Sequence, residues 1–151
     1  MKIHVLTVKQ PWAHLIVHGY LGFDGIIGHK LIENRSRRTN YRGTLYIHAG
    51  KSFDTEAPDY IGDFCPAAKI EVMQSMARIN QERGRIIGRV QLIGCGSREI
   101  ELTPESCWAE VGAWHWILAD PEPVVPFPAR GQLGIWTMDA PPVIETMYFE
   151  E

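Results

Sequence analysis

The residues best suited to chemistry lie between Gly28 and Lys51. This segment holds six basic side chains and one acid, Glu33, and so carries a formal charge of +5, whereas the other 127 residues hold nine bases and seventeen acids and carry −8. The six cations are Lys30, Arg35, Arg37, Arg38, Arg42 and Lys51. A local excess of cations on an otherwise acidic chain is typical of an anion-binding site. A solvated run of charges without a ligand is the alternative.

Glu33 and Arg35 are two residues apart, and on a strand they share one face, where their charges can pair and orient a polar ligand. The forked guanidinium of Arg35 suits a phosphate or a carbonyl edge, and the carboxylate of Glu33 suits an exocyclic amine such as N4 of cytosine. Lys30 joins them only if residue 30 belongs to the turn before the strand, or if a bulge intervenes. A purely structural ion pair and an ordinary exposed lysine are the alternatives.

Other side chains are expected to complete a binding surface for a nucleotide. Flat aromatic faces stack on bases, and cations contact phosphates. The predicted contacts, besides Arg35, are Lys9, Trp12, Arg38, Tyr41, Arg42, His48 and Lys51. Each has a structural alternative: Trp12 shares a helix face with Leu15 and Ile16 and so belongs to a core, Tyr41 and Arg42 fasten a turn, and His48 is a hydrogen-bonded structural residue.

Metal chemistry is not predicted. His14 and His18 have the i, i+4 spacing of a helical chelate, but no glutamate follows His14 to complete HExxH, and no third ligand stands at a recognisable spacing. They fall on the helix side opposite Trp12, Leu15 and Ile16. We therefore expect solvated histidines, no metal and no cofactor.

The composition bounds the class of protein. With 151 residues, 45% hydrophobic and 22% charged, the sequence predicts one compact domain over residues 1–151, with an acidic, peripheral tail from about residue 140. The three cysteines form no CxxC pair and nothing resembles a signal peptide, so a cytoplasmic location is expected. No apolar run reaches about 18 residues, which excludes a transmembrane helix and a membrane partner. A monomer is the default expectation.

These side chains need a scaffold of short strands. Apolar patterns predict strands at residues 3–8, 30–35, 43–49, 85–93, 100–102, 113–119 and 132–138, with an extended proline-rich segment at 121–128. Helices are expected at 11–18, from 66 to about 81, and from a start at 103, with loops at 20–29 and 50–63. The expected core stripe of the second helix is Ile70, Met73, Met76, Ala77 and Ile79. The pattern favours an α+β fold built on a small, partly open barrel.

Several segments together resemble one family over residues 3–138. They are Thr7–Ala13, Leu15-Ile16 with Gly19, Lys30–Arg35, Thr39–Gly43, Ile47–Ala49 with Lys51, Ile86–Val90, His115–Asp120 and Gly131–Trp136. In this order they resemble the ASCH domain of the PUA-like superfamily, some of whose members bind RNA. The resemblance implies a β-barrel cleft roofed by the first helix and lined by Lys30, Glu33 and Arg35. The stretch at 20–29 is longer than usual in the family, and Arg37 stands where many relatives have tryptophan.

Two classes of function follow from these residues and from the resemblance, and a third is kept as a further alternative. The first is a binding module for RNA or a small nucleotide, which recognises a single-stranded or modified nucleotide in the cleft. The second is an enzyme: some ASCH proteins are N4-acetylcytidine amidohydrolases that use a lysine, a threonine three residues later and a distant glutamate. Lys30 matches that lysine, but Glu33 occupies the threonine position. Lys30 and Glu33 remain candidate acid/base groups for such an amidase or, with His48, a ribonuclease. A protein-interaction adaptor is the third.

Overall fold

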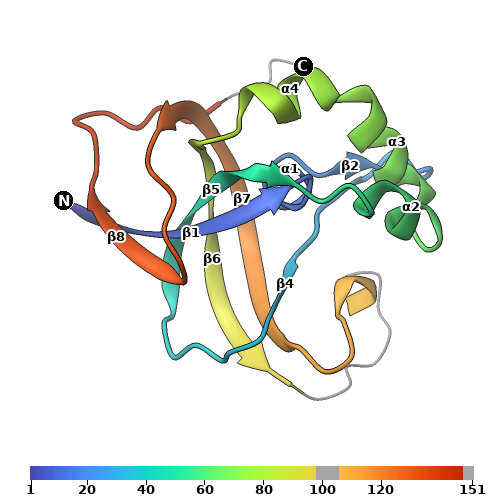
Figure 1. The fold of residues 1–151 in the computed structure, drawn as a ribbon, viewed down its shortest axis with the longest axis horizontal. Helices are drawn as coiled ribbons and strands as arrows, with labels where there is room; N and C mark the ends of the chain where they lie inside the picture. The colour runs from blue at the N-terminus through green and yellow to red at the C-terminus, as the bar shows by residue number, and fades with distance from the viewer. Residues whose placement is uncertain (98–105, 148–151) are drawn as a thin grey trace.

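The computed structural model describes residues 1–97 and 106–147, which form a mixed α+β fold (Figure 1). The expected strand at 100–102 and the helix start at 103 lie outside the described residues. The main sheet has six strands in the order β4-β7-β6-β5-β1-β8, and β2 and β3 form a separate hairpin. β1 and β5 are parallel, and the other pairs are antiparallel. The strands are β1 Lys2–Gln10, β2 Tyr20–Leu21, β3 Ile27–Gly28, β4 Ile32–Arg35, β5 Gly43–Phe53, β6 Arg85–Gly96, β7 Trp114–Pro128 and β8 Ile135–Asp139.

The main sheet curls but does not close. Register shifts interrupt the β1–β5, β5–β6 and β6–β7 pairings, and such bulges bend strands and increase their twist. The guanidinium of Arg35 on β4 therefore reaches the carbonyl oxygen of Thr7 on β1, at 2.9 Å, although three strands separate β4 from β1 in the sheet. Among the described residues, β4 and β8 form the two unpaired edges. This curvature places the ends of β1 and β4 side by side.

The first helix, α1 (Trp12–Val17), packs on the curled sheet. It follows the expected proline, Pro11, and its apolar residues Ala13, Ile16 and Val17 lie in one core with side chains of β1, β5, β6 and β7. Gly88 on β6 permits this packing, because a Cβ atom there would lie 2.4 Å from Cγ1 of Val17. The expected helix at 11–18 is confirmed within a residue at each end.

Three further helices lie beside α1: α2 (Ala57–Gly62), α3 (Pro66–Gln74) and α4 (Met76–Gln81). They form a second core with Leu15 and with Trp108 of the 3₁₀ turn Ser106–Trp108. The single helix expected from 66 to about 81 is wrong, since Ser75 ends α3 and begins α4. The expected core stripe is also largely wrong, because Ile70 and Met73 are 47% and 59% exposed. The buried residues of these two helices are Ala67, Ala68, Val72 and Ile79.

Other expectations differ at the ends of elements. The segment 50–63 is not a loop throughout, because β5 continues to Phe53 and α2 follows. The proline-rich segment 121–128 is extended as expected and completes β7. The tail is not wholly peripheral: Val125 donates its backbone N–H to the Glu145 carbonyl oxygen at 2.7 Å. The three cysteines are free thiols, and no helix of the described residues is long and apolar enough to span a membrane.

The histidines of α1 are not solvated as expected. The His14 side chain is 1% exposed and the His18 side chain 6%, because α3 and α4 cover this side of α1 and place Glu71 and Glu82 against the two rings. Periodicity within one short helix indicated a polar face there, but a later segment of the chain buries it.

Candidate functional site

Lys30 is a buried cation at the wall of a cavity. It lies in the irregular segment just before β4, and the residue is only 4% exposed. The ammonium donates to the Ile32 carbonyl oxygen at 2.5 Å and to Oε1 of Glu33 at 3.2 Å, and it lies 5.5 Å from the Trp12 ring centre. A lysine ammonium has three N–H donors, so with two acceptors among the described residues, one donor remains for a ligand.

Glu33 joins Lys30 to Arg35. Its Oε2 atom accepts from Nε of Arg35 at 2.9 Å and lies 2.8 Å from the second guanidinium nitrogen, while Oε1 accepts from Lys30. Arg35 also donates to the Thr7 carbonyl oxygen and stacks over Trp116 at 5.8 Å. The predicted pairing of Glu33 with Arg35 on one strand face is confirmed, and Lys30 contacts Glu33 from a position just before β4. These three residues meet at one site, and Arg35 is held in place from three sides.

The cavity beside these charges measures about 530 Å³, within the range of small-molecule sites. Trp12, Tyr60 and Trp108 supply an aromatic wall, in which the Trp12 ring lies edge-on to each of the other two with centroids 6.4 Å apart. Trp12 is half-buried, so it both packs in the core and lines the cavity. Burial, followed by the nearby Glu110 carboxylate, raises the pKa of Tyr60 above the ordinary value of a phenol. The cavity thus offers flat apolar faces opposite ionic groups.

Asn34 fastens the far wall of the cavity. Its side-chain amide donates to the Trp108 carbonyl oxygen at 2.8 Å, and its carbonyl oxygen accepts from the backbone N–H of Glu110 at 2.9 Å. These two bonds tie the segment that carries Trp108 and Glu110 to β4. Asn34 lies between Glu33 and Arg35 in the chain, so one short strand provides both the charges and the anchor of the wall.

A second cavity of about 780 Å³ adjoins the first. Thr7, Gly50, Lys51, Gln132 and Leu133 line both cavities. Lys51 is exposed at this junction, and the exposed Arg130 lines the second cavity. His48 lies in the wall of the second cavity, where its ring contacts the Ala129 carbonyl oxygen at 2.7 Å and the Thr7 hydroxyl at 3.2 Å. Both ring nitrogens of His48 therefore have partners within the protein, which matches the alternative that His48 is a hydrogen-bonded structural residue.

The predicted binding residues divide into two groups. Lys9 and Lys51 line the first cavity with Lys30, Glu33, Arg35 and Trp12. Arg38, Tyr41 and Arg42 line neither cavity. Tyr41 stacks on His4 and donates to the Thr44 carbonyl oxygen, and Arg42 donates to carbonyl oxygens of its own turn. The contacts of Tyr41 and Arg42 match the alternative that these two residues fasten a turn. A role in ligand binding stays a prediction for Arg38, Tyr41 and Arg42.

Several cavity residues were not predicted, namely Asn34, Tyr60, Trp108, Glu110 and Gln132. The sequence predicts a loop at Tyr60, which lies in α2, and Trp108 follows the helix start expected at 103 and lies at the end of the 3₁₀ turn Ser106–Trp108. An aromatic pair far from the charged strand carries no spacing signal, because only the tertiary fold brings it to the cavity. Asn34 alone had a local signal, its place between two predicted site residues.

Comparison with known proteins identifies the relatives of this chain. The family model of the ASCH domain matches residues 6–127. Activating signal cointegrator 1 of Homo sapiens is 30% identical over 139 residues, and the protein of the same name from Mus musculus is 30% identical over 140. Each match covers 89% of this chain but only 22% of the relative, so the chain spans about a fifth of the length of these curated relatives.

Proposed function

The chain belongs to the ASCH domain family, and we propose that it binds RNA or a small nucleotide, with a single-stranded or modified base held in the cavity beside Lys30, Glu33 and Arg35. The observation that carries the proposal is the meeting of these three charged groups opposite an aromatic wall. We also infer that the open, curled sheet is the partly open barrel of PUA-like proteins, with α1 as its roof.

The charges fit the hydrogen-bonding edge of a base. The remaining N–H of Lys30 can donate to a ring nitrogen or carbonyl oxygen, and Glu33 keeps lone pairs that accept from an exocyclic amine. Cytosine offers this combination of amine donor and neighbouring acceptors, and adenine offers a similar one. Trp12 or Trp108 would stack on the base plane. Uracil, which has no exocyclic amine, should bind more weakly.

The phosphates of a bound nucleotide would lie in a different part of the site from its base. Lys9 and Lys51 lie at the exposed part of the first cavity, and Lys51 and Arg130 lead into the second. A nucleotide with its base in the first cavity can place its phosphate near Lys51, and a following nucleotide can enter the second cavity. This arrangement favours a short single strand over a duplex, whose paired bases cannot enter a cavity.

Binding is tested by calorimetric titration of cytidine, adenosine and uridine and of short single-stranded RNA. Arg35→Ala and Lys30→Met should each weaken cytidine binding at least tenfold, since about 1.5–3 kcal/mol rests on each charged hydrogen bond. Arg89→Ala is the matched control: Arg89 pairs with Glu122, contacts the Tyr46 ring and is 29% exposed, against 27% for Arg35, but it lines neither cavity. Circular dichroism checks that each variant is folded. No binding by the wild type, or equal binding by Arg35→Ala and Arg89→Ala, contradicts the proposal.

Hydrolysis is the alternative function, favoured by the buried Lys30 and Glu33 pair in a cavity. Against it, Glu33 stands at the position where the amidohydrolases have a threonine. Incubation with N4-acetylcytidine and with single-stranded RNA separates the two functions. Cytidine with acetate, or cleaved RNA, lost in Lys30→Met, establishes an enzyme, and binding without either product leaves a binding module.

A further inference from the structure

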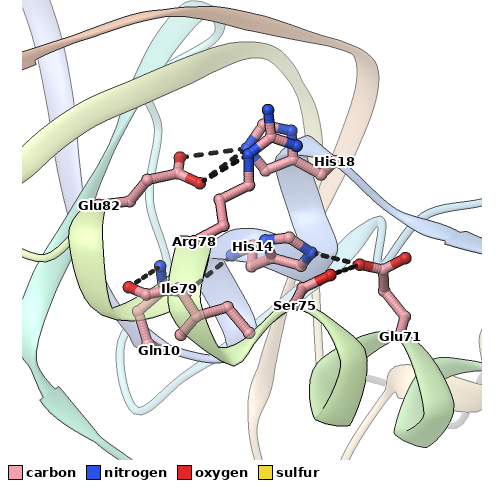
Figure 2. Close-up of polar contacts among 8 residues, drawn as sticks. All are labelled: Gln10, His14, His18, Glu71, Ser75, Arg78, Ile79 and Glu82. Atoms are coloured by element: carbon pink, nitrogen blue, oxygen red, sulfur yellow. Dashed lines mark hydrogen bonds and ion pairs between the residues drawn. The ribbon is translucent and has the colours of Figure 1, made fainter.

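A largely buried cluster of two histidines and two glutamates joins α1 to α3 and α4, outside the residues that line the two cavities (Figure 2). His14 lies within α1 and His18 caps its end, Glu71 comes from α3, where its side chain is 27% exposed, and Glu82 is the residue that caps the end of α4. Glu82 is 4% exposed. Burying this many titratable side chains in one place is costly unless they bind one another or a cation.

The hydrogen bonds of the cluster leave two electron pairs without a partner. A ring nitrogen of His14, Nε2, lies 2.8 Å from Oε2 of Glu71, which also accepts from the Ser75 hydroxyl. Because a carboxylate only accepts, Nε2 carries the hydrogen, and Nδ1 of His14 is left with its lone pair. Nε2 of His18 likewise lies 3.1 Å from Oε2 of Glu82, a hydrogen bond that an ion shared by these two side chains would replace. Both Nδ1 atoms are buried and have no hydrogen-bond partner among the described residues.

The donor atoms are close enough to hold one ion. One ring nitrogen from each histidine and one carboxylate oxygen of Glu82 lie within 4.8 Å of one another. Zn²⁺ bonds of about 2.0–2.1 Å in a tetrahedron place ligand atoms about 3.3–3.4 Å apart, so small side-chain rotations bring this set into range. A histidine that ligates a metal usually donates its other ring hydrogen to a carboxylate, as His14 does to Glu71.

We propose that His14, His18 and Glu82 form a binding site for a divalent transition-metal ion, with Zn²⁺ as the best match, and that Glu71 orients His14 as a positioning residue. Two imidazoles and one carboxylate suit Zn²⁺, whereas Mg²⁺ and Ca²⁺ prefer oxygen ligands. The bound ion would link α1 to α4. This reverses the sequence-based expectation, which sought a third ligand near His14 along the chain, whereas Glu82 is 64 residues from His18.

One cation already competes for the site. Nε of Arg78 lies 3.6 Å from Oε1 of Glu82, and the Arg78 side chain is 40% exposed (Figure 2). Because this side chain reaches solvent, it can move away when an ion binds Glu82. Arg78→Gln should therefore tighten Zn²⁺ binding severalfold, whereas a metal-free cluster would give no such gain.

The test is a titration of Zn²⁺ and Co²⁺ into protein first dialysed against a chelator. We expect one ion per chain, a visible Co²⁺ absorption typical of a four-coordinate site, a higher melting temperature with Zn²⁺, and no effect of Mg²⁺. His18→Gln and Glu82→Gln should each weaken Zn²⁺ binding at least tenfold. His115→Gln is the matched control, because His115 is also buried, its Nδ1 has no partner within the part of the chain that the structure describes, and it has no place in this cluster.

The wild-type titration alone can overturn the proposal, whatever the folding of the variants. Failure of the wild type to bind Zn²⁺ at micromolar concentration, or binding that His18→Gln and Glu82→Gln leave unchanged, shows that the cluster is a structural network only. Equal binding of Mg²⁺ and Zn²⁺ also contradicts it, since the histidines then contribute nothing.

Discussion

Glu33 is the residue on which the charges of the first cavity converge. Its two oxygens are shared between Lys30 and Arg35, and its side chain is 9% exposed. A buried cation such as Lys30 is tolerated because this carboxylate compensates it, and removal of one partner from a buried group of charges leaves the others uncompensated. Glu33 therefore stabilises the fold and also holds Lys30 and Arg35 in the positions in which a ligand would contact them.

Replacing this carboxylate should be costly. Glu33→Gln keeps the size of the side chain but removes its charge, and we expect the free energy of unfolding to fall by about 3 kcal/mol, as for other broken buried ion pairs. Urea denaturation measures the difference. Glu110→Gln, an exposed acid of the same cavity, is the control and should change stability by less than about 0.5 kcal/mol. Equal effects of the two substitutions would mean that Glu33 is not a structural centre.

Residues of the site differed in how far the sequence could place them. The pairing of Glu33 with Arg35 was predictable, because two positions on a strand share a face whatever the rest of the fold does. The position of Lys30 depended on where β4 begins, which periodicity fixes poorly. The burial of His14 was not predictable, because its partner Glu71 is 57 residues away and the helix that carries it is placed by tertiary packing.

At the scale of elements, the close approach of α1 to the sheet positions the cavity. Trp12 is the first residue of α1 and lines the cavity. Val17 is the last residue of α1 and packs against Gly88 on β6. A Cβ atom at residue 88 would lie 2.4 Å from Cγ1 of Val17 and 2.9 Å from the Glu122 carbonyl oxygen. Any side chain there must push the helix outward.

Gly88→Ala should thus loosen the helix from the sheet. We expect a loss of about 1–3 kcal/mol in unfolding free energy, the usual cost of overpacking, and weaker ligand binding because Trp12 shifts with α1. Gly96→Ala on the same strand is the control, since no atom of the described residues lies within 4 Å of its added Cβ. Both variants are compared by thermal unfolding and by cytidine titration. A stable Gly88→Ala protein that binds normally would show that α1 is not held so closely.

Helices α3 and α4 show why helical spacing alone predicted the wrong buried residues. Ile70 and Ile79 both belonged to the expected stripe, but Ser75 breaks the helix between them, and the phase of α3 does not continue into α4. Ile79 is fully buried and Ile70 is 47% exposed. The strands of the main sheet were easier to predict, because their alternation is local and their ends moved by only a few residues, whereas the short hairpin of β2 and β3 lies in the expected loop at 20–29.

A matched pair of substitutions tests this assignment. Ile79→Ala removes a side chain from the second core and should cost about 2–5 kcal/mol, whereas Ile70→Ala, the same chemical change at a half-exposed position, should cost much less. Denaturant unfolding of the two variants gives the comparison directly. Similar losses would indicate that α3 presents Ile70 to the core, as the spacing had suggested.

At the scale of the whole molecule, the net charge of −3 divides between a cationic segment and an acidic remainder. Cations line the first cavity at Lys9, Lys30, Arg35 and Lys51, against Glu33 and Glu110. The acidic remainder repels any polyanion that extends beyond this region. Affinity for single-stranded RNA should accordingly rise over the first few nucleotides and then level off.

Salt dependence separates the phosphate contacts from base recognition. If about three phosphates bind, the logarithm of the association constant should fall with that of salt concentration with a slope of about −2, whereas uncharged cytidine should be nearly insensitive. Lys51→Ala should make the slope shallower by about 0.7, the value of one phosphate contact. Lys2→Ala, an exposed lysine paired with Asp139 and outside both cavities, should leave it unchanged. Fluorescence anisotropy of a labelled oligonucleotide at several salt concentrations measures each slope. An oligonucleotide slope near zero, or equal slopes for the two variants, would show that Lys51 does not contact a phosphate. Binding of a base in the first cavity would then be tested by the cytidine titration alone.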